Sequence, residues 1–158
     1  MRPFSWIGLF SFLVVSTTAL AQMESLGPKD PLAAAHVSAK EIREIIAGVK
    51  KSAYDIPKSW STELRLRRVD LGNGPGIVVQ GTSLLCGGTG NCQIWVFRKA
   101  NVNWVSMFAN DQTILAEGFN FGPAVTHHIK DLTIVTNLSA DESKRVTYKF
   151  DGSLYRTR

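Results

Sequence analysis

The feature that most constrains the fold is a series of short apolar or alternating segments, separated by turn residues, that begins after Trp60. Segments of about four to eight residues bounded by Gly, Pro, Asn and Asp are typical of β-strands. The turn signals include Asn73-Gly74-Pro75-Gly76 and Asp151-Gly152, which are common turn sequences. This spacing predicts a meandering antiparallel sheet, a sandwich or a partly open barrel. The predicted strands are Glu63–Leu71, Gly76–Thr82, Gln93–Lys99, Val102–Ala109, Thr113–Phe119, Ala124–Ile129, Leu132–Leu138, Lys144–Phe150 and Ser153–Thr157.

A single amphipathic helix is predicted before the strands, over Ala39–Ala53. Ser38 and Glu41 have the spacing of a capping box, in which each side chain bonds the other residue's backbone N–H. Four apolar residues then follow one helical face at i, i+3, i+4 and i+7: Ile42, Ile45, Ile46 and Val49. Such a stripe predicts that the helix packs on the sheet. The predicted fold class is therefore mainly β (α+β).

Two of the predicted strands carry apolar residues on both faces. They contain the segments Ile94–Phe97 and Trp104–Phe108. A strand that is buried on both faces needs a packed layer on each side of its sheet. The N-terminal helix is the expected cover for one of these faces.

The N-terminus has the three parts of a secretory signal. A positive start at Met1–Pro3 precedes the apolar run Phe4–Val15, and Ala19-Leu20-Ala21 follows as a small-residue cleavage site. We predict cleavage after Ala21, a secreted or periplasmic product and no stable membrane insertion after cleavage. The predicted organisation is a signal peptide at 1–21, an extended lead-in at 22–37 and a single β-rich domain at 38–158.

Export determines how the two cysteines are interpreted. Cys86 and Cys92 are the two ends of a seven-residue loop rich in glycine, and in an oxidising compartment they are expected to form a disulfide. A redox dithiol or a metal-binding pair are the alternatives, although a zinc site needs two further ligands. Exposed residues of this loop are candidate contacts for a partner: Gly88, Thr89 and Asn91.

The last two predicted strands form a hairpin with alternating side chains. Asp151-Gly152 favours a two-residue type I′ turn, which places Phe150 opposite Ser153 and Tyr148 opposite Tyr155. Cross-strand aromatic pairs usually stabilise a sheet from within the core. The alternative is that Tyr148 and Tyr155 are a stacking platform for a sugar ring or a base.

The sequence contains no recognisable catalytic or metal-binding motif, and no cofactor is predicted. His127 and His128 are adjacent, so on a strand they would point to opposite faces. Either one is a candidate general base, since histidine often transfers protons near neutral pH. A small envelope-directed hydrolase using His127 or His128 is therefore one alternative function.

The chain is moderately basic, with a formal net charge of +5. Loss of Arg2 with the signal peptide leaves a net charge of +4. A net charge of this size mainly favours solubility, and no nucleic-acid partner is expected. A second alternative function is an anionic-surface binder that uses Arg65, Arg67 and Arg145.

Two segments resemble parts of small uncharacterised exported bacterial proteins. The first is the C-G-G-T-G-N-C loop with its following strand, at Cys86–Phe97, and the second is the Y-x-F-D-G-x-x-Y hairpin at Tyr148–Tyr155. The resemblance implies an envelope location and a disulfide-pinned β-domain, and it transfers no active-site residues. The leading hypothesis is an exported, non-catalytic binding or inhibitory module whose partner is an envelope protein or polymer.

Overall fold

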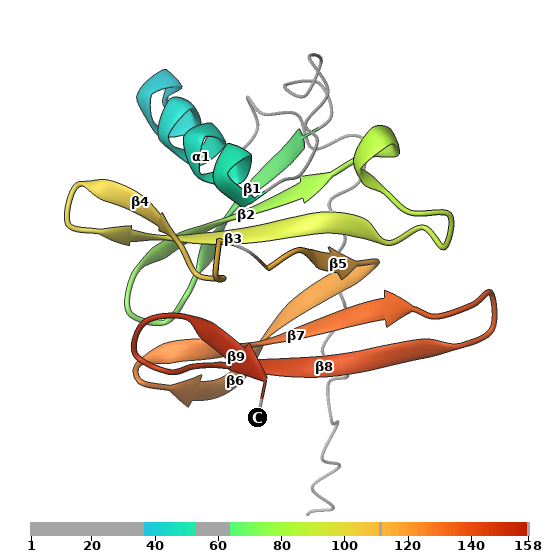
Figure 1. Cartoon of the computed structure of the whole chain (residues 1–158). Coiled ribbons are helices and arrows are strands. Elements are labelled where there is room, and N and C mark those ends of the chain that lie inside the picture. The colour runs from blue at the N-terminus through green and yellow to red at the C-terminus, as the bar shows by residue number, and fades with distance from the viewer. Residues whose placement is uncertain (1–36, 53–63, 111, 158) are drawn as a thin grey trace, which may run out of the picture.

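The fold consists of three layers, with a helix on one side of a β-sandwich (Figure 1). The computed structural model describes residues 37–52, 64–110 and 112–157, and the predicted signal peptide and the lead-in up to residue 36 lie outside these ranges. Helix α1 (Ala39–Ser52) covers one face of the first sheet, and the second sheet packs on the other face. The predicted class, mainly β with an N-terminal helix packed on antiparallel sheets, is confirmed as a sandwich.

Each sheet is formed by consecutive strands, all paired antiparallel. The first sheet has the order β1-β2-β3-β4, with β5 also paired to β3, and a short 3-10 turn, η3 (Ser83–Leu85), follows β2. Its strands are β1 (Leu64–Asp70), β2 (Pro75–Gly81), β3 (Cys92–Ala100), β4 (Asn103–Ser106) and β5 (Ile114–Ala116). The second sheet has the order β6-β7-β8-β9, with β6 (Gly118–Thr126), β7 (Ile129–Asn137), β8 (Ser143–Phe150) and β9 (Tyr155–Thr157).

The chain passes from the first sheet to the second at Glu117. The Glu117 backbone N–H donates to the Val135 carbonyl over 2.9 Å. The Thr136 hydroxyl donates to the Leu115 carbonyl over 2.9 Å. The strand predicted over Thr113–Phe119 is therefore divided, because its first half pairs with β3 and its second half with β7.

The turn between β6 and β7 is not where the sequence predicts it. The sequence predicts a break between the strands Thr113–Phe119 and Ala124–Ile129, but β6 continues through Phe121-Gly122-Pro123 with a bulge before Val125. Proline is compatible with an edge strand at a bulge, where no ladder hydrogen bond is lost. The turn is instead formed by His127 and His128, both in the left-handed region with φ of 49° and 64°. The prediction that these histidines lie on a strand is wrong.

The His127-His128 turn gives a stability prediction. Two consecutive residues with positive φ favour Asn-Gly, because a side chain with a Cβ is strained in this conformation. The double substitution His127→Asn/His128→Gly is expected to raise the free energy of unfolding by about 1 kcal/mol. Urea unfolding of the two proteins measures this difference. A decrease would show that the imidazoles make stabilising contacts of their own.

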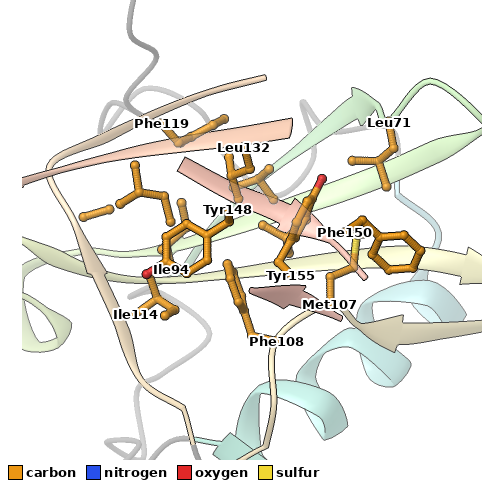
Figure 2. Packing of buried hydrophobic residues seen from close by; sticks show 14 of the residues in the cluster. Leu71, Ile94, Met107, Phe108, Ile114, Phe119, Leu132, Tyr148, Phe150 and Tyr155 are labelled. Atoms are coloured by element: carbon orange, nitrogen blue, oxygen red, sulfur yellow. The ribbon is translucent and has the colours of Figure 1, made fainter. Parts of the chain in front are cut away.

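The core between the two sheets, called the inter-sheet core below, contains most of the buried aromatic side chains (Figure 2). The Phe108 ring lies 5.4 Å from that of Tyr148 and 5.9 Å from that of Tyr155, measured between centroids. Its members are Leu71, Val78, Ile94, Val96, Met107, Phe108, Ile114, Ala116, Phe119, Ile129, Leu132, Ile134, Tyr148, Phe150 and Tyr155.

A second cluster lies between α1 and the first sheet, where Ile45 and Val49 of the helix meet the strands. Ile94 and Val96 of β3 belong to the inter-sheet core, whereas Trp95 and Phe97 belong to this helix-side cluster. The prediction that β3 is buried on both faces is confirmed. The other members of the helix-side cluster are Leu64, Leu66, Ile77, Val79, Leu85 and Trp104.

The C-terminal hairpin has a longer turn than predicted. Phe150 pairs with Tyr155, and Tyr148 pairs with Thr157, so the two-residue turn at Asp151-Gly152 is wrong. The shift in register is even, and therefore both tyrosines stay on the core side of the sheet.

The Asp151 side chain explains the longer turn. Its Oδ1 accepts hydrogen bonds from the backbone N–H groups of Ser153 and Leu154, each over 2.8 Å. The Asp151 N–H donates to the Leu154 carbonyl over 2.9 Å, which closes a four-residue loop. Aspartate commonly bonds the backbone two residues ahead in this way, and here that bond replaces the type I′ geometry.

Candidate functional site

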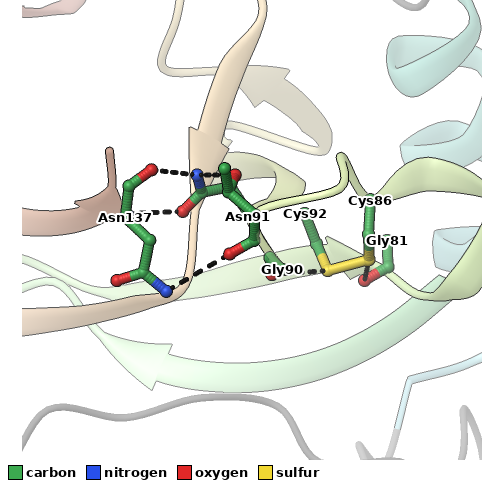
Figure 3. Close-up of a disulfide and its surroundings, with 7 residues drawn as sticks. Gly81, Cys86, Gly90, Asn91, Cys92 and Asn137 are labelled. Carbon is green, nitrogen blue, oxygen red and sulfur yellow. Dashed lines mark hydrogen bonds between the residues drawn. A yellow bond between two sulfur atoms is a disulfide. The ribbon is translucent and has the colours of Figure 1, made fainter. Parts of the chain in front are cut away.

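The cysteine loop is closed by the predicted disulfide (Figure 3) and by two backbone hydrogen bonds. Cys86 and Cys92 are bonded, so the disulfide prediction is confirmed. Within the loop, the Gly87 N–H donates to the Asn91 carbonyl over 2.8 Å, and the Gly90 N–H donates to the Gly87 carbonyl over 3.0 Å. Gly90 has a φ of 81°, which favours glycine at this position. The loop is thus fixed from within.

Asn91 fixes the same loop to the second sheet. Its side chain is buried, with 4% of the residue exposed. The Asn91 Nδ2 donates to Thr89 Oγ1 over 2.6 Å and to the Asn137 carbonyl over 2.7 Å, while Oδ1 accepts from the Asn137 N–H over 2.8 Å. The amide therefore pairs with Asn137 as a neighbouring strand would. Asn91, predicted as a contact for a partner, is buried, and its side-chain amide is bonded within the chain.

The exposed part of the loop is the segment 87–90, which contains the predicted contacts Gly88 and Thr89. A Cβ built on Gly88 would meet no atom within 4 Å, so a side chain at this position would extend into solvent. The Thr89 hydroxyl accepts the hydrogen bond from Asn91. Gly88 is therefore a position at which a side chain can be added to this surface without a clash.

Three exposed leucines lie on elements next to this segment, although none was predicted as a site residue. Leu84, Leu115 and Leu138 are 65%, 42% and 51% exposed. Leu84 lies in η3 directly before the loop, Leu115 pairs with Gln93 just after it, and Leu138 follows the residue that Asn91 bonds. Figure 1 shows η3, β5 and the β7–β8 connection at one end of the sandwich. We call this surface, formed by Leu84, segment 87–90, Leu115 and Leu138, the loop end.

Removal of the disulfide gives a second stability prediction. The double variant Cys86→Ser/Cys92→Ser is expected to lower the free energy of unfolding by about 2.4 kcal/mol, because closing a loop of this length restricts the unfolded chain. Denaturant unfolding measures the change, and the reduced parent protein is the matched control. Equal stability of oxidised and reduced protein would mean that the hydrogen bonds of the loop are sufficient by themselves.

The candidate platform residues Tyr148 and Tyr155 lie in the inter-sheet core. They are 9% and 1% exposed, respectively. The Tyr155 hydroxyl donates to the Lys130 carbonyl over 2.7 Å. Neither ring presents a face to solvent, so the core alternative holds and the stacking platform is wrong. The physical reason is that the second sheet buries this face against the first.

The structure gives the candidate bases no partner. His127 and His128 are exposed at the β6–β7 turn. Within 37–52, 64–110 and 112–157, neither imidazole has a hydrogen bond or an ion pair that would orient it.

No group of three or more His, Cys, Asp or Glu in these ranges could hold a metal ion. No helix among the described residues is long and apolar enough to span a bilayer.

The three candidate arginines do not form one patch. Arg65 and Arg67 are half-buried on the face of β1 that also carries Val69, which packs on the inter-sheet core. Arg145 lies on β8 of the other sheet and alternates with Val146, so it points away from the core. The anionic-surface binder predicted from the three arginines therefore has no common arginine surface, because they lie on different sheets and point in different directions.

A cleft of about 380 Å³ lies between α1 and the segment that includes β4. Its walls combine aromatic, small and charged side chains, and neither His127 nor His128 lines it. The lining residues include Glu44, Gly48, Lys51, Trp104, Phe108 and Asn110. The cleft therefore lends no support to catalysis by the histidine pair.

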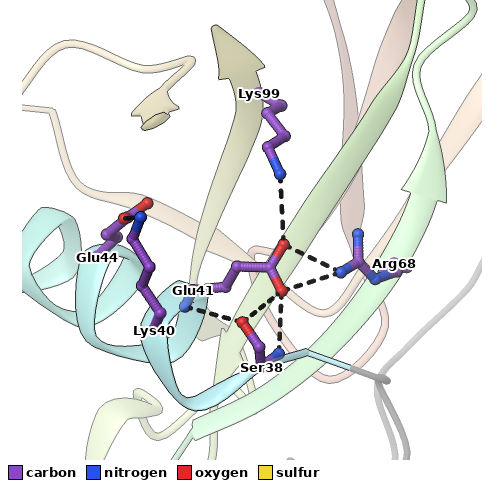
Figure 4. Close-up of polar contacts among 6 residues, drawn as sticks. All are labelled: Ser38, Lys40, Glu41, Glu44, Arg68 and Lys99. Carbon is purple, nitrogen blue, oxygen red and sulfur yellow. Dashed lines mark hydrogen bonds and ion pairs between the residues drawn. The ribbon is translucent and has the colours of Figure 1, made fainter. Parts of the chain in front are cut away.

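The charged residues at the start of α1 have a structural role (Figure 4). The predicted capping box is present: the Ser38 N–H donates to Glu41 Oε2 over 2.9 Å, and the Glu41 N–H donates to the Ser38 hydroxyl over 3.3 Å. Arg68 and Lys99 of the first sheet lie 3.1 Å and 3.8 Å from the Glu41 carboxylate. The Ser38 hydrogen bonds, with a further contribution from Arg68, lower the pKa of Glu41 to about 2.

This lowered pKa predicts a pH dependence of stability. Because the folded-state pKa lies below the unfolded value of about 4.3, the Glu41 contribution is present above the unfolded pKa and is lost as the pH falls toward 2. Denaturant unfolding of the parent protein and of Glu41→Gln between pH 5 and pH 2 measures the difference. We expect the stability gap to narrow as the pH falls, whereas a constant gap would contradict this assignment.

No protein-family model, curated protein or solved structure matches this chain. The resemblance of the cysteine loop and the C-terminal hairpin to exported bacterial proteins therefore stays a prediction. Function has to be argued from the surfaces that the described residues form.

Proposed function

We propose that this chain is an exported, non-catalytic binding module of the cell envelope, and that it binds a protein partner through the loop end. The observation that carries the proposal is the arrangement of Leu84, Leu115 and Leu138 around a loop held by a disulfide and by Asn91. Export is supported by the predicted signal peptide and by the disulfide, since such bonds persist in oxidising compartments.

The physical basis for binding is a fixed loop beside apolar surface. A loop that is already ordered loses little conformational entropy when a partner binds. Burying apolar surface stabilises a complex by about 25 cal/mol per Å². Exposed apolar side chains grouped on one surface are typical of protein interaction sites. The loop end offers both contributions at one place.

Both alternative functions have less support than binding at the loop end. A hydrolase needs a base that is oriented by a further group, and His127 and His128 have no such partner among the described residues. Binding to an anionic surface through Arg65, Arg67 and Arg145 needs these side chains on one face, and they occupy two sheets.

Affinity capture with matched variants tests the proposal. Oxidised Gln22–Arg158 is immobilised and exposed to envelope extract of its own cell at low and moderate salt. The test variants are Gly88→Arg and Leu138→Glu. The control is Val102→Glu, which changes an exposed residue of the β3–β4 connection, and this connection lies at the opposite end of the sandwich (Figure 1). We expect one protein to be retained at both salt concentrations by the parent and the control, and lost with both test variants.

Two other outcomes would overturn the proposal. Retention by all four proteins would exclude the loop end as the contact surface. Retention of wall polymer or lipid alone, and only at low salt, would favour an electrostatic surface. In either case, circular dichroism of the variants establishes that the substitutions have left the fold intact.

A further inference from the structure

The second sheet has an edge that is only partly covered. β9 pairs with Tyr148–Phe150 of β8 and extends no further. The preceding segment of β8, Ser143–Thr147, pairs with β7 on one side, and no strand of the described residues lies on its other side. We call Ser143–Thr147 the open edge.

The hydrogen-bond pattern determines which backbone groups face outward. The Leu138 N–H donates to the Glu142 carbonyl on the β7 side, and the Asp151 N–H donates to the Leu154 carbonyl on the β9 side. In an antiparallel ladder, successive residues direct their N–H and C=O groups to alternate sides. Both hydrogen bonds therefore indicate that the odd-numbered residues of the open edge direct their backbone N–H and C=O groups away from β7. They are Ser143, Arg145 and Thr147.

The side chains of the open edge are positively charged. Lys144 and Arg145 are both exposed, and neither has an ion-pair partner among the residues that the structure describes. Val146, between Arg145 and Thr147, is half-buried and packs against the inter-sheet core. A strand added at this edge would therefore meet two cations and one apolar side chain.

We infer that the open edge binds an acidic, extended segment of the protein partner by strand addition. This inference rests on the proposed function and names the chemistry of the partner. Backbone hydrogen bonds to an exposed sheet edge are an established mode of peptide recognition, and carboxylates in the added strand would pair with Lys144 and Arg145. At the other edge of this sheet, β6 carries Pro123 and a bulge, features that oppose strand addition.

A second copy of this chain fits the open edge less well. If two open edges pair antiparallel so that all three outward residues are matched, Arg145 lies opposite Arg145 of the other copy. Like charges directly opposite each other destabilise a sheet. The charges that favour an acidic strand thus also oppose self-association.

The register of an antiparallel strand added at the open edge determines the sequence of a peptide probe. Read from its N-terminus, a strand opposite Thr147 to Ser143 would present Thr-Val-Glu-Glu-Thr. The valine lies over Val146, and the two glutamates face Arg145 and Lys144. The probe is a fluorescent peptide with this sequence, and its binding to oxidised Gln22–Arg158 is measured by anisotropy. The control peptides have Lys-Lys in place of Glu-Glu, or an N-methyl group on the first glutamate.

The expected result separates backbone pairing from charge. N-methylation of the first glutamate is expected to weaken binding about tenfold, because it removes the bond to the Arg145 carbonyl while keeping the charge. Arg145→Pro, which removes an outward N–H and a charge, is expected to weaken binding more than Arg145→Ala, which removes the charge alone. Proline is tolerated at an edge position whose N–H faces solvent.

Three outcomes would overturn the inference. The first is that the N-methylated peptide binds as tightly as the unmethylated probe. The second is that the Lys-Lys peptide binds as tightly as the Glu-Glu probe. The third is dimerisation of the parent chain through this edge in sedimentation experiments. The proposed function can be judged separately. Loss of the captured protein with Gly88→Arg but not with Arg145→Pro would support the loop end and reject the strand.

Discussion

Tyr155→Ala is expected to lower the free energy of unfolding by about 4 kcal/mol, since removal of a large buried aromatic side chain leaves a cavity. Tyr155 is 1% exposed and packs against the rings of Phe108 and Phe150 in the inter-sheet core. Its backbone N–H donates to the Met107 carbonyl over 2.7 Å. The residue thus connects β9 to the segment that follows β4, and urea unfolding measures the loss.

Tyr155→Phe is the matched control for the alanine variant. It keeps the ring and removes only the hydroxyl that bonds the Lys130 carbonyl, so a loss of about 1 kcal/mol is expected. Burial, with a smaller contribution from Asp131, raises the pKa of Tyr155 well above its usual value. The hydroxyl therefore stays protonated as a donor. Equal losses in the two variants would show that the hydrogen bond, and not packing, accounts for the stability.

Asn91→Ala has the second largest expected effect, a loss of about 3 kcal/mol, because two backbone groups of Asn137 lose their partners together. The Thr89 hydroxyl loses its donor as well. Chemical unfolding measures the change in stability. Amide hydrogen exchange at Asn137 is expected to accelerate in the variant, because its N–H no longer has an acceptor.

Asn137→Ala separates this effect from a general disturbance of the loop. Asn91 bonds the backbone of Asn137, and the Asn137 side chain makes a single long contact of 3.4 Å with the Thr89 carbonyl. The control is therefore expected to cost less than about 1 kcal/mol. A loss as large as that of Asn91→Ala would contradict the role given to the Asn91 amide.

The features that the sequence predicts correctly depend on local patterns. The capping box at Ser38 and Glu41, the apolar stripe of the helix and the burial of β3 on both faces follow from spacing alone. The disulfide follows from the presence of two nearby cysteines in a chain with a predicted export signal. In each case, residues close in sequence carry the information.

The features that the sequence predicts incorrectly depend on competing or distant interactions. Asp151-Gly152 favours a tight turn by itself, but hydrogen bonds to the Asp151 side chain lengthen it. His-His has no turn propensity, so the β6–β7 connection is set by pairing of the strands around it. Asn91 shows no sign of its role until Asn137, 46 positions away, is placed beside it.

The loop end shows a further limit of sequence patterns. An isolated leucine in a turn segment does not reveal whether the folded chain covers it. The elements that carry Leu84, Leu115 and Leu138 lie at one end of the sandwich because β3 pairs with β5 and Asn91 bonds Asn137. A surface of this kind becomes visible when tertiary contacts are known.

The passage between sheets at Glu117 has a consequence for folding kinetics. Among the described residues, every strand pair lies on one side of Glu117, so each sheet forms from strands that are near in sequence, which corresponds to a low contact order for a β-protein. Docking of the completed halves then joins residues from the two sides of Glu117, such as Leu71 and Lys130. If docking follows the transition state, weakening the Asn91 or Tyr155 contacts accelerates unfolding and leaves the refolding rate nearly constant.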